Sequence, residues 1–144
     1  TGDDEGEKTV CSSHVPSAEE VATACKNFIG EISQIPPVYS AIKVNGKRAY
    51  DLARQGKTVA LEPRKVTIHN LTVDSYQYPD IEMTVEVSSG TYIRTLVEDI
   101  GAELSTGAYT AALRRTAVGD FSITHAVTPQ EAITNIKERL RVIA

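Results

Sequence analysis

The stretch IEMTVEVSSGTYIRTLVEDIGAEL, residues 81–104, decides the fold because its hydrophobic pattern changes period at the glycine in the middle. Before Gly90, apolar residues occupy alternate positions, which is typical of a strand with one buried face. After Gly90, apolar residues recur every three or four positions, which predicts an amphipathic helix that Thr91 caps. The stretch therefore predicts a strand, a tight turn and a helix.

Two capping boxes mark the start of further helices. Ser17 stands three residues before Glu20, which predicts a helix over about residues 18–29 that ends at Gly30. Thr128 stands three residues before Glu131, with Pro129 between them at the first helical position. The apolar face of this terminal helix is expected to comprise Ile133, Ile136 and Leu140.

The segments between these helices predict strands and an elaborated loop. Residues 65–73 are expected to form a strand, and strand-like pieces follow at 110–118 and 121–124. Residues 34–59 are expected to form the loop, with an Asn-Gly turn at 45–46 and a short helix over 48–55. Helices and strands without strict alternation favour the α+β class, with a mixed, mainly antiparallel sheet and packed helices.

Composition places the chain among soluble globular domains. Hydrophobic residues make up 41% and charged residues 24% of the 144 residues, and no apolar run approaches the ~20 residues of a membrane span. The chain starts without the pattern of a secretory signal, so we expect a cytoplasmic protein in which Cys11 and Cys25 are reduced. The three histidines are scattered without metal-ligand spacing, so no metal site is expected.

Charge is strongly segregated along the chain. Residues 1–31 carry seven acids and two lysines, whereas residues 43–65 carry seven Lys or Arg and two acids, a local net charge of +5. The acidic opening, residues 1–9, predicts a solvated connector. The basic segment favours either a solvated face or a loop that contacts the RNA backbone and stacks on bases through Tyr39 and Tyr50.

Tyr92 and Arg94 lie where the strand pattern gives way to the helical pattern. A junction of this kind can direct both side chains into one crevice at the end of a sheet. A tyrosine ring can stack on a base and its hydroxyl can take part in proton transfer, while an arginine offers a fixed cation. The alternative is a tyrosine half in the core and an arginine paired on the surface.

Three long phrases, in order, carry a family resemblance: QIPPVYSAIKVNGKRAYDLARQG (34–56), VSSGTYIRTLVEDIGAEL (87–104) and GAYTAALRRTAVGDF (107–121). They resemble the bacterial TruB-type tRNA pseudouridine synthases, which modify uridine 55 in the T loop of tRNA. The resemblance spans about residues 16–136. It implies a pseudouridine-synthase-like α+β fold, present here as the C-terminal part of the catalytic domain, and an isomerase that needs no cofactor.

The resemblance also implies site residues. In the family an aspartate of a Gly-x-Leu-Asp-Pro segment attacks the nucleotide, and the uracil is detached and rejoined through C5. Carried over, Tyr92 would stack on the flipped base and assist proton removal at C5, Arg94 would pair with the aspartate, and Leu113 would line the pocket. The chain contains no Leu-Asp-Pro segment, so we expect it to be inactive alone.

The family's matching loop is a thumb that closes over the T loop, and here it would span about residues 36–64. The RNA-binding residues that this implies are Tyr39, Lys43, Lys47, Arg48, Tyr50 and Arg54. The expected partner is the T-arm of tRNA, with no membrane partner. The resemblance further implies a division into 1–125, part of the catalytic domain, and 126–144, a terminal helix leading toward a further domain.

Two other functions remain open from the residues. One is a non-catalytic RNA-binding module that keeps the thumb and pocket, which the missing aspartate favours. The other is a structural domain without an RNA role, which only the net charge of -4 favours. The exposed edges of an incomplete sheet could also drive non-native self-association.

Overall fold

The computed structural model describes residues 12–37, 43–44, 46–56 and 61–134. The chain divides into two compact units, Thr1–Ala111 and Ala112–Ala144, and each is described here by itself. The acidic opening, Cys11 and the distal part of the predicted terminal helix, with Ile136 and Leu140, lie outside the described residues.

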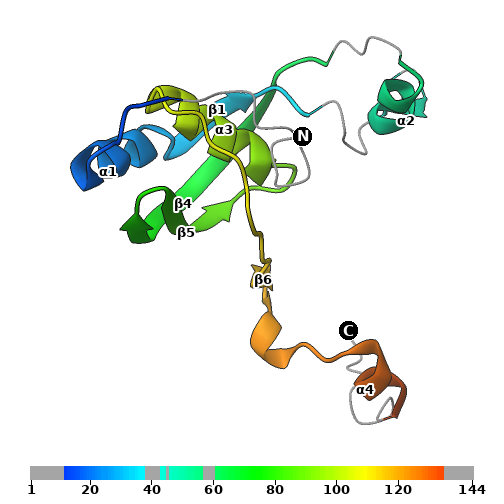
Figure 1. Cartoon of the computed structure of the whole chain (residues 1–144). Helices are drawn as coiled ribbons and strands as arrows, with labels where there is room; N and C mark the ends of the chain where they lie inside the picture. The colour runs from blue at the N-terminus through cyan, green and yellow to red at the C-terminus, as the bar shows by residue number, and fades with distance from the viewer. Residues whose placement is uncertain (1–11, 38–42, 45, 57–60, 135–144) are drawn as a thin grey trace. The chain divides into compact units, whose positions relative to one another are not determined.

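A three-stranded antiparallel sheet forms the centre of the first unit (Figure 1). The long strand β4, Arg64–Gln77, pairs with β5, Asp80–Val87, on one side and with β1, Gly30–Gln34, on the other. Register shifts interrupt the β4–β5 ladder twice, between Ile68 and Asn70 and between Val73 and Ser75. The strand predicted over residues 65–73 and the strand predicted from alternation are both confirmed, and so is the α+β class with its mainly antiparallel sheet.

Strand β1 was not predicted from the sequence. Its five residues, GEISQ, contain one aliphatic side chain, Ile32, so the period-two pattern is too short to recognise. Gly30 was expected to stop the preceding helix, but the helix cap is Phe28 and Gly30 opens β1 with a positive φ of 112°. Pairing with β4, which aligns Gly30 with Ile68, therefore decides the structure here rather than local propensity.

Two helices pack on the sheet through one hydrophobic core. Helix α1, Ala18–Asn27, starts at the predicted capping box: the Ser17 amide donates to Glu20 Oε2 at 2.7 Å, and the Glu20 amide donates to Ser17 Oγ at 3.1 Å. Helix α3 spans Ile93–Glu103. The fully packed residues of the core come from α1, β4 and α3, and they are Val21, Cys25, Ile68, Leu71, Leu96 and Ile100.

The end of α3 is closed by the chain that follows it. The amides of Thr106 and Gly107 both donate to the Gly101 carbonyl at 3.0 Å, and the Ser105 amide donates to the Ala102 carbonyl. This is a Schellman ending in which Ser105, with φ 57°, takes the left-handed position that glycine usually occupies. A Cβ on Gly101 would lie 2.3 Å from the Ala108 amide nitrogen, so the returning chain leaves no room for a side chain.

The loop that follows β1 contains a hairpin and a short helix. Strands β2, Lys43–Val44, and β3, Lys47–Arg48, pair in antiparallel fashion around the predicted turn, of which Gly46 is described and has φ 79°. Helix α2, Ala49–Arg54, follows directly, and Gly56 continues the chain with φ 70°. The short helix predicted over 48–55 is therefore confirmed within one residue at each end.

The second unit contains short elements. Strands β6, Ala117–Val118, and β7, Phe121–Ser122, form a two-residue hairpin, a 3-10 turn spans Ile123–His125, and α4 spans Pro129–Thr134. The strand predicted over 110–118 was too long, since only Ala117–Val118 pair as β6. Among the described residues, most of this segment has no neighbouring strand, and an isolated two-stranded hairpin has marginal stability.

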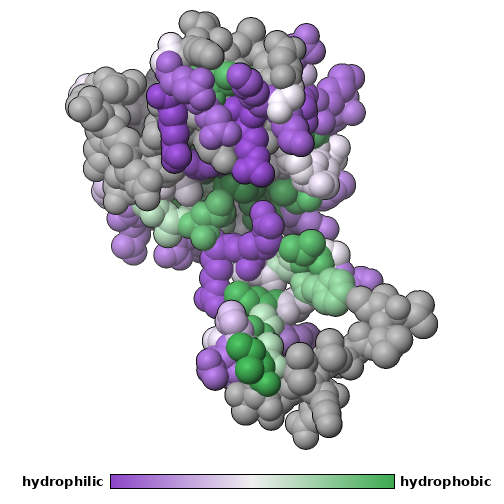
Figure 2. Space-filling view, turned by 90° about the vertical axis from the view of Figure 1, so that its right-hand side faces the viewer, coloured by the Kyte–Doolittle hydropathy of each residue, from purple (hydrophilic) through white to green (hydrophobic). Residues whose placement is uncertain are grey.

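The predicted capping box of the terminal helix is confirmed. The Thr128 amide donates to Glu131 Oε2 at 2.8 Å, and the Glu131 amide donates to Thr128 Oγ1 at 3.3 Å. Hydrophobic residues, in green, are visible on this unit in the lower part of Figure 2. Its exposed large side chains include Leu113, Val118, Phe121 and Ile133. In neither unit do the described helices include one with the length and apolar character needed to cross a membrane.

Replacing Gly101 with alanine should destabilise the first unit. In an ordinary helix interior this change stabilises a protein by about 0.5–1 kcal/mol, but here the new methyl group collides with the backbone of residues 107–108. Overpacking of this kind costs about 1–3 kcal/mol. Urea denaturation of the 144-residue chain measures the change, with Ala102→Gly as a control that costs about 1 kcal/mol through propensity alone. A gain in stability for Gly101→Ala would contradict the close approach.

Candidate functional site

The turn between β5 and α3 is held by its own side chains. The Ser88 amide donates to the Thr67 carbonyl at 2.8 Å, and the Thr67 amide donates back to Ser88 Oγ at 2.9 Å. Thr91 Oγ1 donates to the Ser88 carbonyl at 2.8 Å. Gly90 has φ 81°, a conformation that other residues adopt only with strain. Residues 88–91 therefore fix the point at which α3 begins.

Tyr92, rather than Thr91, is the N-cap of α3. Thr91 was expected to cap the helix, but its hydroxyl is used by the turn, and the Tyr92 side chain makes no capping hydrogen bond. The Tyr92 backbone is held instead by Gln34 at the end of β1. Gln34 Nε2 donates to the Tyr92 carbonyl at 3.1 Å, and the Tyr92 amide donates to Gln34 Oε1 at 3.0 Å.

Tyr92 and Arg94 are both half-buried, at the N-cap and the second position of α3. This degree of burial fits both alternatives, a tyrosine half in the core with an arginine paired on the surface or a pair directed into a crevice. Leu113, the third predicted site residue, belongs to the second unit, where its side chain is 63% exposed. The predicted roles of these three residues stay predictions.

Three of the predicted RNA-binding residues surround one depression. Lys43, Lys47 and Arg48 line a hollow of about 470 Å³ on the hairpin and α2, and Lys43 lies opposite Arg48 across the ladder. All three side chains are exposed, as is Arg54 on α2. Tyr39 and the side chain of Tyr50 lie outside what the structure describes. The sequence showed only that these cations occur in one segment, whereas the hairpin brings three of them around one depression.

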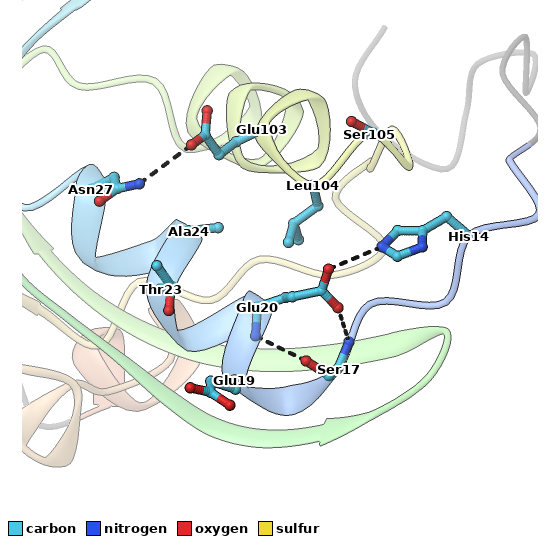
Figure 3. Close-up of a pocket in the computed structure, with 10 residues that line it drawn as sticks. All are labelled: His14, Ser17, Glu19, Glu20, Thr23, Ala24, Asn27, Glu103, Leu104 and Ser105. Carbon is cyan, nitrogen blue, oxygen red and sulfur yellow. Dashed lines mark hydrogen bonds and ion pairs between the residues drawn. The ribbon is translucent and has the colours of Figure 1, made fainter.

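A larger groove than this depression lies elsewhere, between α1 and the C-terminal end of α3 (Figure 3). It measures about 640 Å³ and was not predicted. It is lined by His14, Ser17, Glu19, Glu20, Thr23, Ala24, Asn27, Glu103, Leu104 and Ser105. Along the axis of α3, Glu103 in this groove lies about 16 Å from Tyr92, since each helical residue adds 1.5 Å. Among the described residues, no cluster of acids, histidines and cysteines is suited to a metal ion.

Glu20 organises this groove, as Figure 3 shows. Its carboxylate accepts the Ser17 amide and lies 3.3 Å from His14 Nε2, and across the groove Asn27 Nδ2 donates to Glu103 Oε1 at 3.3 Å. The backbone and side-chain hydrogen bonds from Ser17, with a smaller contribution from His14, hold the pKa of Glu20 below its ordinary value of 4.5. These contacts are structural: they cap α1 and tie it to α3.

Burial raises the pKa of two other groups in the first unit, the Cys25 thiol and the Asp99 carboxyl. Cys25 is a free, buried thiol in the core. Its predicted reduced state is consistent with this position, whereas Cys11 lies outside the described residues.

A solved structure shares this arrangement of sheet and helices. The crystal structure of a Cbf5-Nop10-Gar1 complex contains a chain that is 30% identical, with a TM-score of 0.66 over 86% of this chain and 32% of that one. The fold is therefore that of the pseudouridine synthases.

Sequence comparisons identify the family to which the chain belongs. Residues 1–93 match the TruB family pseudouridylate synthase (N terminal domain), and residues 94–139 match the tRNA pseudouridylate synthase B C-terminal domain. The chain belongs to the TruB family of pseudouridylate synthases, of the bacterial type.

Relatives named tRNA pseudouridine synthase B occur in several bacteria. The chain is 46% identical over 131 residues to the protein of Pseudomonas syringae pv. syringae, with 91% of this chain and 43% of the relative covered. It is 43% identical over 143 residues to that of Rickettsia felis, with 96% and 42% covered. For Burkholderia mallei the identity is 48% over 130 residues, with 89% and 42% covered. The chain thus spans less than half the length of these relatives.

The contribution of Glu20 to stability should disappear in acid. Because its pKa is lower in the folded than in the unfolded chain, the contribution is present above pH 4.5 and is lost as the pH falls through the folded value. Glu20→Gln should therefore lower Tm near pH 6 and have a much smaller effect near pH 3.

Thermal unfolding followed by circular dichroism at both pH values measures this difference. Glu19→Gln is the matched control, since it removes a carboxylate from the same helical turn and leaves the bonds between Ser17 and Glu20 in place. An equal pH dependence in the two variants would show that Glu20 makes no separate contribution.

Proposed function

We propose that the chain is the thumb-bearing, C-terminal part of the catalytic domain of a cytoplasmic tRNA pseudouridine synthase that isomerises uridine 55 in the T loop. The observation that carries this proposal is the match to both family segments in sequence order, residues 1–93 and 94–139. In this proposal residues 1–125 belong to the catalytic domain and residues 126–144 lead toward a further domain.

The proposed reaction moves a glycosidic bond without net oxidation. The bond between C1′ and N1 of the uridine breaks, a bond between C1′ and C5 forms, C5 loses a proton and N1 gains one. Because the base must leave the RNA stack, the site needs a flat aromatic surface and a shaped pocket. Tyr92 supplies the aromatic face and a hydroxyl for the proton at C5, Arg94 orients the attacking aspartate, and Leu113 lines the pocket.

The attacking aspartate of this proposal is supplied by a segment outside these 144 residues, which contain no Leu-Asp-Pro sequence. The isolated chain is therefore inactive, while the full-length protein that contains it is active. Because β1 and β5 form the two edges of the described sheet, the isolated chain also self-associates through them. Light scattering that shows only monomer would contradict this last point.

Tritium release from a T-loop hairpin RNA with 5-tritiated uridine should distinguish these statements. The full-length protein should release tritium, and the 144-residue chain alone should not. Tyr92→Phe keeps the ring but removes the hydroxyl, so turnover should fall by about 10²- to 10⁴-fold, the usual contribution of general acid–base catalysis.

Tyr78→Phe provides the control, because Tyr78 is 50% exposed on the β4–β5 connection. Equal turnover for the Tyr92 and Tyr78 variants would remove Tyr92 from the chemistry. Release by the isolated chain would mean that one of its own carboxylates is the nucleophile.

A non-catalytic RNA-binding module is the second candidate, favoured by the cationic depression on the hairpin. Both candidates require that the depression binds RNA. The Lys47→Ala and Arg48→Ala double variant of the 144-residue chain should bind a T-loop hairpin more weakly. It should also show a salt slope smaller by up to about 2, because about one counterion is released per phosphate contact.

Fluorescence anisotropy at several salt concentrations measures both quantities. The matched control is the Lys26→Ala and Lys65→Ala double variant, which removes the same charge from α1 and β4 outside the insertion. Equal losses for the two double variants would indicate non-specific attraction and would favour a structural domain.

A further inference from the structure

We propose that Gln34 is a positioning residue for the active site: its buried carboxamide holds the backbone of Tyr92 and ties the root of the thumb-like insertion to the site. This role rests on the proposed function, in which Tyr92 contacts the target base. No substrate contact by Gln34 is involved.

The burial of Gln34 shows that its polar group has a specific task. Its side chain is 1% exposed, at a strand position that packs inward and that an aliphatic residue would fill without desolvation cost. Both halves of the carboxamide are used on one partner, with Nε2 donating to the Tyr92 carbonyl and Oε1 accepting from the Tyr92 amide. A glutamate could only accept, and an asparagine is one methylene shorter, so the pair selects glutamine.

The peptide groups that Gln34 holds set the direction of the Tyr92 side chain. Tyr92 is in the extended region, with φ -97° and ψ 108°, and its own side chain does not cap the helix. Its carbonyl also accepts the Leu96 amide at 3.1 Å, the first hydrogen bond of α3. Gln34 therefore fixes the residue at which an extended turn becomes a helix, and with it the base of the tyrosine ring and the start of the turn that carries Arg94.

The same side chain lies where the insertion leaves and rejoins the sheet. Gln34 is the last residue of β1, and its partner across the ladder is Arg64, the first residue of β4. Pro36 follows as a buried residue, and residues 35–63 connect the two partners. Both ends of the insertion thus meet at the residue that is bonded to Tyr92. The carboxamide that holds Tyr92 therefore lies at the base of the insertion.

Two substitutions separate the hydrogen bonds. Gln34→Met keeps the length and removes both bonds, whereas Gln34→Glu keeps the acceptor for the Tyr92 amide and loses the donor. In the 144-residue chain, amide hydrogen exchange measured by NMR should be about tenfold faster at Tyr92 in Gln34→Met than in wild type. Exchange should also be faster in Gln34→Glu, because the buried carboxylate faces the Tyr92 carbonyl without a donor.

In the full-length protein, the kinetics of tritium release from the T-loop hairpin should show a split. For Gln34→Met, kcat should fall by about 10- to 100-fold, as expected when a catalytic group is misplaced by up to 1 Å, while KM stays within about twofold. Val21→Ala is the stability control, since it opens a cavity in the core on α1 and leaves the pair between Gln34 and Tyr92 intact. It should lower Tm with little change in kcat.

A fall in kcat no larger than that of Val21→Ala at equal Tm would reduce Gln34 to a structural role and overturn the proposal. Unchanged hydrogen exchange at the Tyr92 amide in Gln34→Met would also overturn the proposal, because it would show that Gln34 does not hold the Tyr92 backbone. An inactive wild-type protein would overturn the proposed function, and with it the positioning role. This outcome is distinguishable because it appears before any variant is compared.

Discussion

Ile68 on the central strand and Leu96 on α3 are both completely buried and belong to one cluster with Val21 and Cys25 of α1. Burial of such a side chain contributes roughly 1.5–3 kcal/mol, so the shared cluster holds both helices on the sheet. It also fixes where α3 lies on the sheet. Since Tyr92 and Arg94 stand within one turn of Leu96, the same packing determines where the predicted site residues emerge.

The elements with strong local signals could be predicted from sequence. Alternation identified β5, and reciprocal capping pairs identified the starts of α1 and α4, because these patterns depend on neighbours within four residues. Strand β1 could not be found in this way, since one aliphatic residue does not make a pattern. Thr91 is a better intrinsic cap than Tyr92, but the Ser88 carbonyl competes for its hydroxyl.

In the candidate site, too, local features could be predicted from the sequence, whereas contacts between distant residues could not. The sequence predicted a basic segment, and the hairpin register then explains why Lys43 and Arg48 lie opposite each other. The hydrogen bonds between Gln34 and Tyr92 join positions 58 residues apart, so no local sequence pattern predicts them. The groove beside Glu20 is likewise a product of helix packing, because Asn27 and Glu103 meet only in the folded chain.

The cross-strand pair of Gln34 and Arg64 has a consequence for how this fold can vary. Partners in an antiparallel ladder have Cα atoms about 5 Å apart, so residues 35–63 begin and end at nearly the same point. A segment with coincident ends can lengthen, shorten or change its internal structure while the sheet keeps its register. The entropy of closing such a loop rises only slowly with its length. The sheet thus stays fixed, and the insertion is the part of the fold that can be remodelled without disturbing it.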